Sequence, residues 1–411
     1  MGEITGILVD LFIIFAAARL AGELFVRVKQ PAIVGEVFAG ITIGPHALGL
    51  IGSPDSDLVT LFGDHEAARR ALNVVFDVIA ELGVIILLFF VGLETRLDDL
   101  LSVKGRAAAA GVLGTILPFA AGFGFVYATG RSDVESAFVA TAMVATSVGI
   151  TARVLSDLGA MASDEARVII GAAVVDDILG LLLLAVVRSW GKGDVDVVEL
   201  AITALAAVAF VVFAAMVGTQ LIRRYSIHLE RLRIENAPFV AAILLMLGFS
   251  ALAGTIGLAA VIGAFIAGMM LAEADEALEL QRQARPVYEF LVPFFFVVIG
   301  TKVDLGAFQD TEVLAIAVAV TLLAILTKLA SGGLAAIGLG PRSAAIIGTG
   351  RVPRGEVGFV VAGVGTGIGA VSGDMFAVVV FMSIVTTLVA PPALAALVAG
   401  EREAAATPME A

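Results

Sequence analysis

Long apolar runs, separated by short polar or glycine- and proline-containing breaks, follow one another along nearly the whole chain. An α-helix needs about 20 apolar residues to cross the hydrocarbon core of a bilayer, so the pattern predicts an all-α polytopic membrane protein with about 13 transmembrane helices. No run of residues is left over for a soluble domain. The spans are predicted near residues 4–28, 31–51, 72–93, 105–129, 135–156, 165–188, 197–222, 237–253, 255–272, 286–303, 311–332, 342–367 and 374–399.

Composition supports this class and excludes several others. The 411 residues are 60% hydrophobic and 15% charged, whereas a soluble domain carries roughly 25% charge. Cysteine is absent, so disulfides, thiol catalysis and Cys-based metal sites are excluded, and three histidines argue against a His-rich metal site. The net charge of −13 argues against nucleic acid as a partner. We expect no cofactor, and a lipid bilayer as the surroundings.

Basic residues between the spans predict the orientation in the membrane. They are more numerous in the odd-numbered connections and the C-terminal tail than in the even-numbered connections. Because basic loops stay in the cytoplasm, the N-terminus is predicted outside and the C-terminus inside the cell (inner) membrane. The connection 223–235 carries the strongest cytoplasmic signal.

Two spans contain clusters that disfavour a continuous helix. The span 135–156 contains Ala145–Thr151, rich in hydroxyl and β-branched residues, and the span 342–367 contains Gly348–Glu356, with one proline, three glycines and three charges. Both helices are expected to unwind there, which is tolerated at membrane depth only beside a cavity or inside protein. Their placement in the two halves of the chain predicts inverted repeats with an ion site where the broken helices meet.

The neighbouring carboxylates Asp176 and Asp177 lie near the middle of the otherwise apolar run 168–187. An ionised aspartate at membrane depth costs several kcal/mol unless it faces water, an ion or a buried cation. A single protonated core aspartate is the structural alternative, but nothing structural requires two. The pair is therefore predicted to be functional.

Lys328 is the cation that we expect to compensate this charge. It lies within the apolar span 311–332, where it either extends toward the interface or forms a buried ion pair. Adjacent helical residues point about 100° apart, so the two aspartates face different surroundings and cannot have the same role. We predict that Asp176 pairs with Lys328 and that Asp177 is the open ligand.

The residue types near these charges suit a hard monovalent cation, which prefers oxygen ligands. Asp177, Thr146 and Ser147 are the candidate ligands, and the carboxylate of Asp177, when it holds no cation, binds a proton. Arg354 and Glu356 flank the second break. They either neutralise each other and the ends of the half-helices or take part in the ion path.

Several motifs follow one another in order along essentially the whole chain, at Pro31–Pro45, Leu48–Gly49, Phe89–Glu94, Ala145–Arg153, Gly263–Gly268, Pro293–Gly300 and Val352–Gly358. Together they resemble the motifs of the monovalent cation:proton antiporter-2 family. The aspartate pair together with Lys328 is similar to the NapA-type sodium/proton antiporters, which implies an NhaA/NapA-like antiporter fold and Na⁺ at Asp177 and Thr146.

The resemblance implies a homodimer that works by an elevator-type movement. Residues 1–103 and 237–304 would form the dimerisation scaffold, and residues 104–190 and 305–399 the moving ion-binding core. Residues 191–236 would link them, and 400–411 would be a disordered tail. Asp177 would be the main ion and proton carrier, the Asp176–Lys328 pair would break and reform during the cycle, and exchange would be electrogenic.

Other functions fit the sequence less well. A potassium/proton antiporter of the same family would show the same motifs, and a sodium-coupled symporter shares a related fold. An intramembrane aspartyl protease needs two carboxylates that face each other, normally from different helices. A channel needs rings of ligands along a continuous pore, and no phosphate-binding glycine motif supports an ATP-driven pump. The leading interpretation is a sodium/proton antiporter rather than an enzyme.

Overall fold

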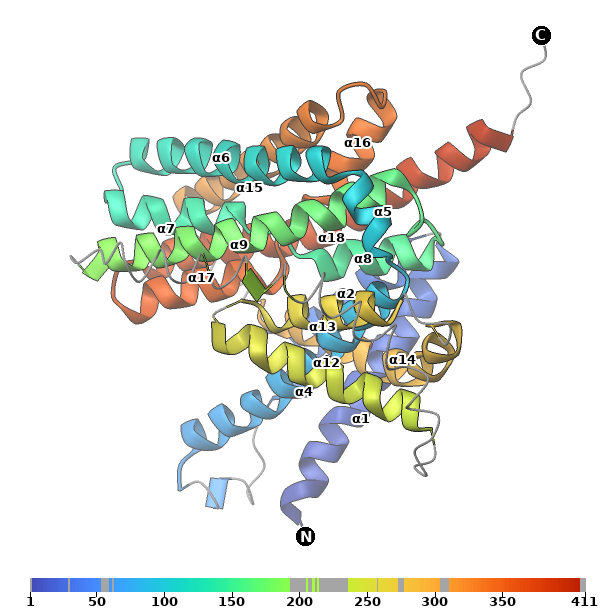
Figure 1. The fold of residues 1–411 in the computed structure, drawn as a ribbon. Helices are drawn as coiled ribbons and strands as arrows, with labels where there is room; N and C mark the ends of the chain where they lie inside the picture. Colours follow the sequence, from blue (N-terminus) through green and yellow to red (C-terminus); the bar gives the residue numbers. More distant parts are fainter. Residues whose placement is uncertain are drawn as a thin grey trace. The chain divides into compact units, whose positions relative to one another are not determined.

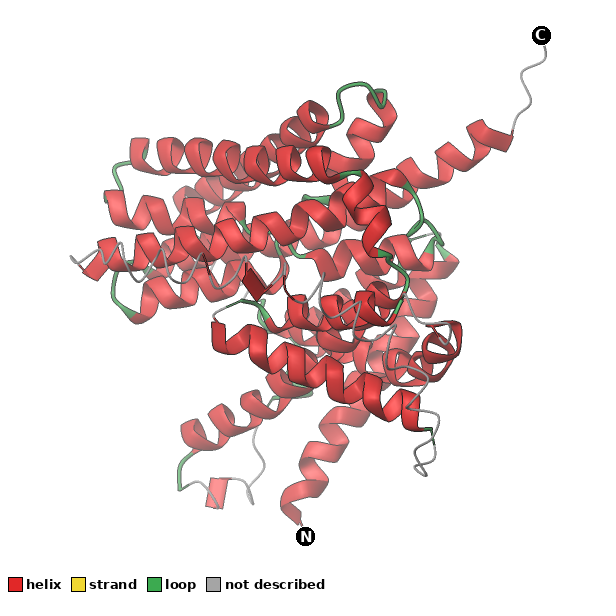
Figure 2. Ribbon diagram, in the orientation of Figure 1, coloured by secondary structure: helices red, strands yellow, loops and turns green. Residues whose placement is uncertain are grey.

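The fold is all-helical throughout the part of the chain that the structure, a computed structural model, describes (Figures 1 and 2). The fold class predicted from the apolar runs is therefore confirmed. The described residues are 2–28, 30–52, 59–60, 63–192, 205, 209–210, 213, 236–256, 258–272, 277–303 and 310–406. The helices are α1 (Gly2–Arg27), α2 (Ala32–Ile43), α4 (His65–Leu93), α5 (Leu97–Ser102), α6 (Lys104–Ala128), α7 (Asp133–Val144), α8 (Val148–Asp157), α9 (Asp164–Lys192), α12 (Ala237–Ile256), α13 (Ala260–Leu271), α14 (Ala277–Thr301), α15 (Thr311–Ala335), α16 (Pro341–Gly350), α17 (Gly355–Gly367) and α18 (Gly373–Ala406).

Each predicted span except the seventh matches one described helix or one pair of half-helices. The span 197–222 lies almost entirely outside the described residues. Within the described part, 8 helices or joined half-helices are long and apolar enough to cross a membrane. The shorter apolar helices are 32–43, 260–271 and 357–367.

Several helices are longer than predicted, among them α4, α14 and α18. α4 begins at His65, seven residues before the expected start of the third span. α18 continues to Ala406, beyond the predicted end of the last span at residue 399, and the disordered tail expected for residues 400–411 stays a prediction. Residues 401–406, Glu-Arg-Glu-Ala-Ala-Ala, are all good helix formers, and propensity extends the last helix beyond its apolar part.

The chain groups by its contacts into two compact units. One unit consists of Met1–Leu87 with Ala284–Ala307, and the other of Leu88–Gln283 with Phe308–Ala411. These two units are defined by contacts within the structure. The predicted scaffold and moving core are defined by how they move, so that division stays a prediction.

Close contacts between glycines define the packing of the first unit. Gly35 on α2 lies so near the backbone of Ala21 on α1 that a β-carbon there would overlap the Ala21 carbonyl. Gly40, further along α2, packs directly on Gly300 of α14, and neither glycine has room for a side chain. Close helix crossings in membrane proteins favour small residues for this reason.

The second unit repeats this arrangement. Gly263 on α13 lies against the backbone of Phe249 on α12, and Gly268 packs directly on Gly92 of α4. The hexapeptides at 35–40 (Gly-Glu-Val-Phe-Ala-Gly) and 263–268 (Gly-Ala-Phe-Ile-Ala-Gly) place their glycines at the same spacing. The helix pairs α1–α2 and α12–α13 therefore share one local packing scheme, as a duplicated half-chain should.

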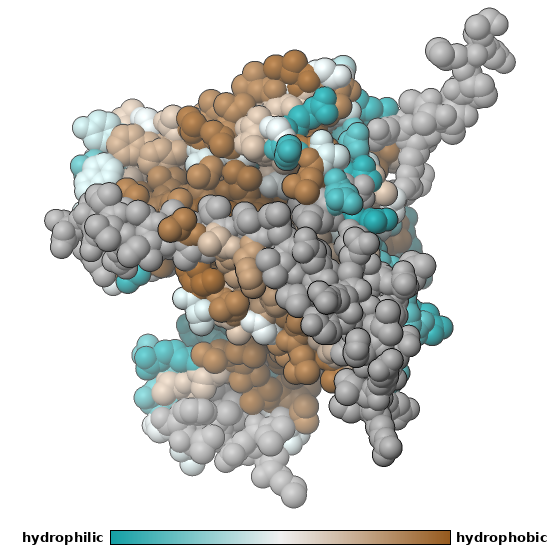
Figure 3. All heavy atoms as spheres, in the orientation of Figure 1, coloured by the Kyte–Doolittle hydropathy of each residue, from teal (hydrophilic) through white to brown (hydrophobic). Residues whose placement is uncertain are grey.

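Six helical segments or pairs of half-helices surround the candidate site in the second unit. α6 packs on α9 and α15, α18 packs on α15 and α17, and the half-helices α7 and α17 contact each other (Figure 1). The outward faces of α6 and α15 carry exposed apolar side chains, and many of the coloured residues in Figure 3 are brown, the colour of apolar residues. Examples are Val112, Ile116, Val318, Leu322 and Leu326. This surface suits contact with lipid.

Both predicted helix breaks are present and meet in the interior. α7 ends at Val144, the backbone is extended at its C-cap Ala145 (φ −52°, ψ 139°), and α8 begins at Val148. α16 ends at Gly350, and α17 begins at Gly355. The amide of Ser147 donates a hydrogen bond to the carbonyl oxygen of Pro353 at 2.8 Å, so the two unwound segments are joined directly.

Candidate ion-binding site

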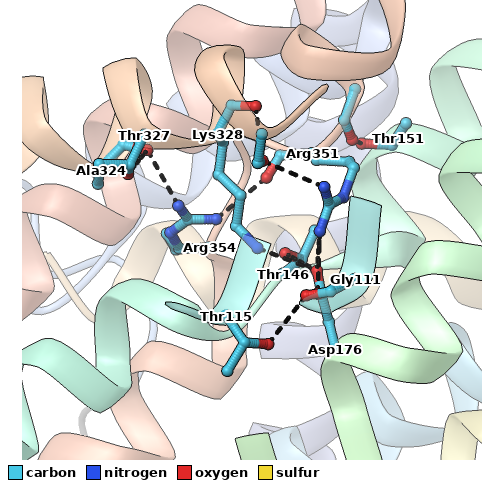
Figure 4. A network of polar contacts seen from close by, with 12 residues as sticks. Gly111, Thr115, Thr146, Thr151, Asp176, Ala324, Thr327, Lys328, Arg351 and Arg354 are labelled. Carbon is cyan, nitrogen blue, oxygen red and sulfur yellow. Dashed lines mark hydrogen bonds and ion pairs between the residues drawn. The ribbon is translucent and has the colours of Figure 1, made fainter. Parts of the chain in front are cut away.

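Asp176, in the middle of α9, is the centre of a buried polar network (Figure 4). Its Oδ2 atom accepts hydrogen bonds from Lys328 Nζ at 3.0 Å and from Thr146 Oγ1 at 2.9 Å. The Nη2 atom of Arg351 lies 2.9 Å from both Oδ1 and Oδ2. Asp176, Lys328 and Arg351 are 0% exposed, so the charges are compensated inside the protein rather than by water.

Three elements bring these groups together. α9 and α15 pass uninterrupted and place Asp176 and Lys328 at depth, while α16 stops one residue before Arg351. Proline at 353 cannot donate the backbone hydrogen bond that a continuing helix needs. The chain therefore leaves the helical path here, which turns the Arg351 side chain into the interior.

The position of Arg351 depends on two further contacts. Its Nη1 atom donates to Ser331 Oγ on α15 at 3.2 Å. On the other side, Gly114 of α6 lies so close that a β-carbon would overlap the guanidinium. Arg351 thus fills a space that only a glycine on α6 leaves open.

Arg354 is also fully buried, but it contacts backbone rather than a carboxylate among the described residues. Its guanidinium donates to the carbonyl oxygens of Arg351 at 3.0 Å and of Ala324 at 3.1 Å. One of these acceptors belongs to Arg351, the C-cap residue of α16, and whether Arg354 is structural or part of the ion path stays a prediction. The side chain of Glu356 lies outside the described residues, so its part in the site stays a prediction.

Asp177, the next residue on α9, borders a cavity. It is partly exposed, and this small cavity of about 10 Å³ is otherwise bordered by apolar side chains that include Val148 and Phe265. A volume of this order holds roughly one water molecule. Val148 is the first residue of α8, so the cavity reaches the broken helix.

Thr146 and Ser147 are buried at that break. The hydroxyl of Thr146 donates to Asp176, although the sequence analysis placed it beside Asp177. Its oxygen keeps lone pairs that can accept a cation. Which carboxylate a hydroxyl faces depends on the rotamer in an unwound segment, and helical periodicity does not set it.

Arg351 and Ser331 are the members of the network that sequence reasoning missed. Of the three charged residues in Gly348–Glu356, the position at the second break draws attention only to Arg354 and Glu356. The number of buried charges could have identified Arg351. Like Lys328, it is a cation within an apolar span, and a buried cation needs an anionic partner. The aspartate pair is the available anion. Ser331 gives no such signal, because a serine on α15 fits many roles.

Comparison with known proteins identifies the family. The family model described as "Sodium/hydrogen exchanger, transmembrane" matches residues 12–400. The chain belongs to the transmembrane sodium/hydrogen exchanger family. It is therefore a multi-pass membrane transporter and not an enzyme, which removes the intramembrane protease interpretation.

Curated relatives are similar over nearly their whole length. The chain is 36% identical to the "High-affinity Na(+)/H(+) antiporter NhaS3" of Synechocystis sp., covering 97% of this chain and 91% of the relative. It is 33% identical to the "Na(+)/H(+)-K(+) antiporter GerN" of Bacillus cereus, covering 93% of this chain and 94% of the relative.

A solved structure supports the fold. The sodium proton antiporter MjNhaP1 from Methanocaldococcus jannaschii, at pH 8, superposes with a TM-score of 0.69 over 96% of this chain and 97% of that chain. Sequence identity is 17%, so this likeness concerns the architecture. The antiporter-type fold that the family resemblance implies is thereby confirmed.

Proposed function

We propose that the protein is a secondary active sodium/proton antiporter that exchanges cytoplasmic Na⁺, or Li⁺, for external H⁺. The observation that carries this proposal is the position of Asp177, a carboxylate on a small cavity at the broken helix, beside a network that already neutralises Asp176. Such a carboxylate can hold a cation or a proton, but not both. The printed names of the two curated relatives agree with sodium/proton exchange.

In this proposal Asp177 carries the ion and the proton, and Thr146 and Ser147 supply further oxygen ligands. Thr146 can do this while its hydroxyl donates to Asp176, because donation leaves the oxygen lone pairs for Na⁺. Asp176 and Lys328 form the coupling ion pair at 3.0 Å. Arg354 and Glu356 support the second break.

The finer assignment is to the NapA-type antiporters, which work as homodimers. The core, residues 104–190 and 305–399, would move past the scaffold, residues 1–103 and 237–304, with 191–236 as the link. The extracellular N-terminus and cytoplasmic C-terminus follow from the basic connections. Exchange would be electrogenic, with the Asp176–Lys328 pair opening and closing in each cycle.

Potassium/proton exchange is the second candidate. The name of the Bacillus cereus relative includes potassium beside sodium, and oxygen ligands serve both ions. A sodium-coupled symporter is a weaker alternative, because a carboxylate that exchanges its ion for a proton suits antiport.

Proton flux in proteoliposomes tests this proposal. Vesicles holding a pH gradient and a pH-sensitive dye receive sodium, lithium or potassium in turn. We expect sodium and lithium to collapse the gradient with wild-type protein and to have no effect with Asp177→Asn. Asp133→Asn is the matched control: it removes an exposed acid at the start of α7 and should leave the flux unchanged.

Each other outcome has a defined meaning. A response to potassium alone would change the substrate and keep the mechanism. Full sodium-dependent flux in Asp177→Asn would reject Asp177 as the carrier. The absence of cation-dependent proton flux with folded wild-type protein would reject antiport.

A further inference from the structure

We propose that a cavity in the first unit binds a phosphate-type oxyanion, either the headgroup of an anionic lipid or a soluble phosphate. The cavity measures about 170 Å³ and is lined by the segment after α2, by α4 and by the end of α14. This is roughly ten times the space that one water molecule needs. None of the lining residues belongs to the candidate ion-binding site, so the inference goes beyond the proposed function.

Close backbone packing builds this cavity. Gly44, directly after α2, lies so near the end of α14 that a β-carbon there would come within 3.0 Å of the Thr301 α-carbon. The chain then turns back at Gly49, whose φ of +61° suits glycine and whose amide donates to the Gly44 carbonyl at 2.9 Å. His46, within this turn, and Lys302, next to Thr301, therefore line the same cavity.

One face of α4 supplies the polar side of the cavity. Arg69, Asn73 and Asp77 follow at intervals of four residues, which places them on the same helix face, and all three line the cavity. Asp77 accepts a hydrogen bond from Lys302 Nζ at 2.8 Å. Arg69 forms no ion pair with any residue in the described part of the chain. Asp77 lies about 12 Å further along the helix axis, too far to neutralise it.

The groups around the cavity favour an anion over a cation. Arg69, Asn73 and Lys302 all present N–H donors. Among the described lining residues Asp77 is the single carboxylate, and it is already bonded to Lys302. Two permanent cations thus stand against one carboxylate. An arginine fork binds two oxygens of a phosphate group at once, so an oxyanion satisfies these donors better than a spherical ion does.

The melting temperature of the purified full-length protein in uncharged detergent tests this site, because a ligand of the folded state raises it. The probes are inorganic phosphate, with chloride at equal ionic strength as control, and short-chain phosphatidylglycerol, with short-chain phosphatidylcholine as control. The sodium concentration is held constant. We expect one of the two probes to raise the melting temperature of the wild-type protein in a saturable way, and its control not to.

Two neighbouring arginines provide a matched comparison. Arg69→Gln removes the unpaired guanidinium of the cavity, and we expect the half-maximal probe concentration to rise about tenfold or more. Arg70→Gln removes the same charge from the next residue on α4, which is exposed, donates to the Glu66 carbonyl at 3.4 Å and does not line the cavity. It should bind the probe like the wild-type protein.

Asp77→Asn gives a prediction of opposite sign. It removes the carboxylate from the lining and releases the Lys302 ammonium, so the probe should bind more tightly than to the wild-type protein. A merely solvated surface would show no such gain. This variant also keeps the proposal testable if Arg69→Gln does not fold.

The two probes distinguish the sources of the ligand. A response to phosphate that depends on Arg69 assigns a soluble oxyanion, and a response to phosphatidylglycerol alone assigns a lipid headgroup. No saturable response to either probe would overturn the proposal. So would equal effects of Arg69→Gln and Arg70→Gln, or unchanged or weaker binding in Asp77→Asn. Transport is not measured in any arm, so failure here and failure of the proposed function are distinguishable.

Discussion

The backbone amide of Ser147 donates to the carbonyl of Pro353 at 2.8 Å, joining the unwound segments of the two broken helices. The Thr151 hydroxyl adds a second link, to the carbonyl of Gly350 at 2.6 Å. Unwound backbone leaves polar groups without helical partners, and in a buried site each needs another one. Each unwound segment supplies hydrogen-bond partners for polar groups of the other. These bonds fix the position of the ion site relative to the half-helices.

Ser147→Pro removes the amide donor of this link. The φ angle of Ser147, −82°, is within reach of proline, so the main loss is the hydrogen bond rather than backbone strain. We expect a loss of about 1–3 kcal/mol of stability from the unsatisfied Pro353 carbonyl, measured as a lower melting temperature in detergent. Ser147→Ala keeps the amide and is the control. Equal destabilisation by both substitutions would contradict this account.

Asp176→Asn removes the anion that Lys328 and Arg351 share. Breaking a buried pair from one side typically costs about 3–5 kcal/mol, so a large fall in melting temperature is expected. Asp177→Asn leaves the contacts of Asp176 with Lys328 and Arg351 in place, so it should lower the melting temperature less. Similar melting temperatures for the two variants would show that Asp176 is not the structural centre of the network.

Gly114→Ala places a methyl group against the Arg351 guanidinium. Overpacking of a buried site costs about 1–3 kcal/mol, and displacement of the guanidinium should also lower the transport rate. Gly124→Ala on the same helix meets no neighbouring atom and provides the control. Thermal unfolding and dye-based flux measure the two effects, and wild-type behaviour of Gly114→Ala would contradict the packing seen here.

The duplicated glycine contacts predict matched effects in the two halves of the chain. Gly40→Ala and Gly268→Ala each force apart two backbones in contact, so both should destabilise by about 1–3 kcal/mol. Gly248→Ala on α12 faces open space and should be neutral or slightly stabilising. Thermal unfolding of the three variants measures this. Tolerance of alanine at only one of the two buried positions would show that the halves pack differently.

Much of the fold could be predicted because bilayer thickness sets the length of each apolar span and helix-breaking residues act on their own segment. Proline 353 with its neighbouring glycines, and the hydroxyl cluster around Ser147, identify both breaks from sequence alone. The partnership of Asp176 with Lys328 followed from the cost of buried charge and is present in the structure. Its part in coupling stays a proposal.

Other features depend on contacts between distant segments, which no local pattern encodes. Arg351 reaches Asp176 only because the chain unwinds at its own position and Gly114 leaves room on another helix. Thr146 donates to Asp176, and helical periodicity does not set the direction of a side chain between two half-helices. The guanidinium of Arg354 donates to backbone carbonyls. Every residue has a backbone carbonyl, so residue types do not reveal this contact.

Proton release on sodium binding tests the central claim, that Asp177 holds either the ion or the proton, most directly. Sodium is added to purified protein in weakly buffered solution with a pH indicator. The account predicts that the wild-type protein releases protons when sodium is added. It also predicts that sodium binds more weakly at lower pH, because protons compete for the same carboxylate. Asp177→Asn should show neither proton release nor this pH dependence. Proton release that persists in folded Asp177→Asn would contradict it.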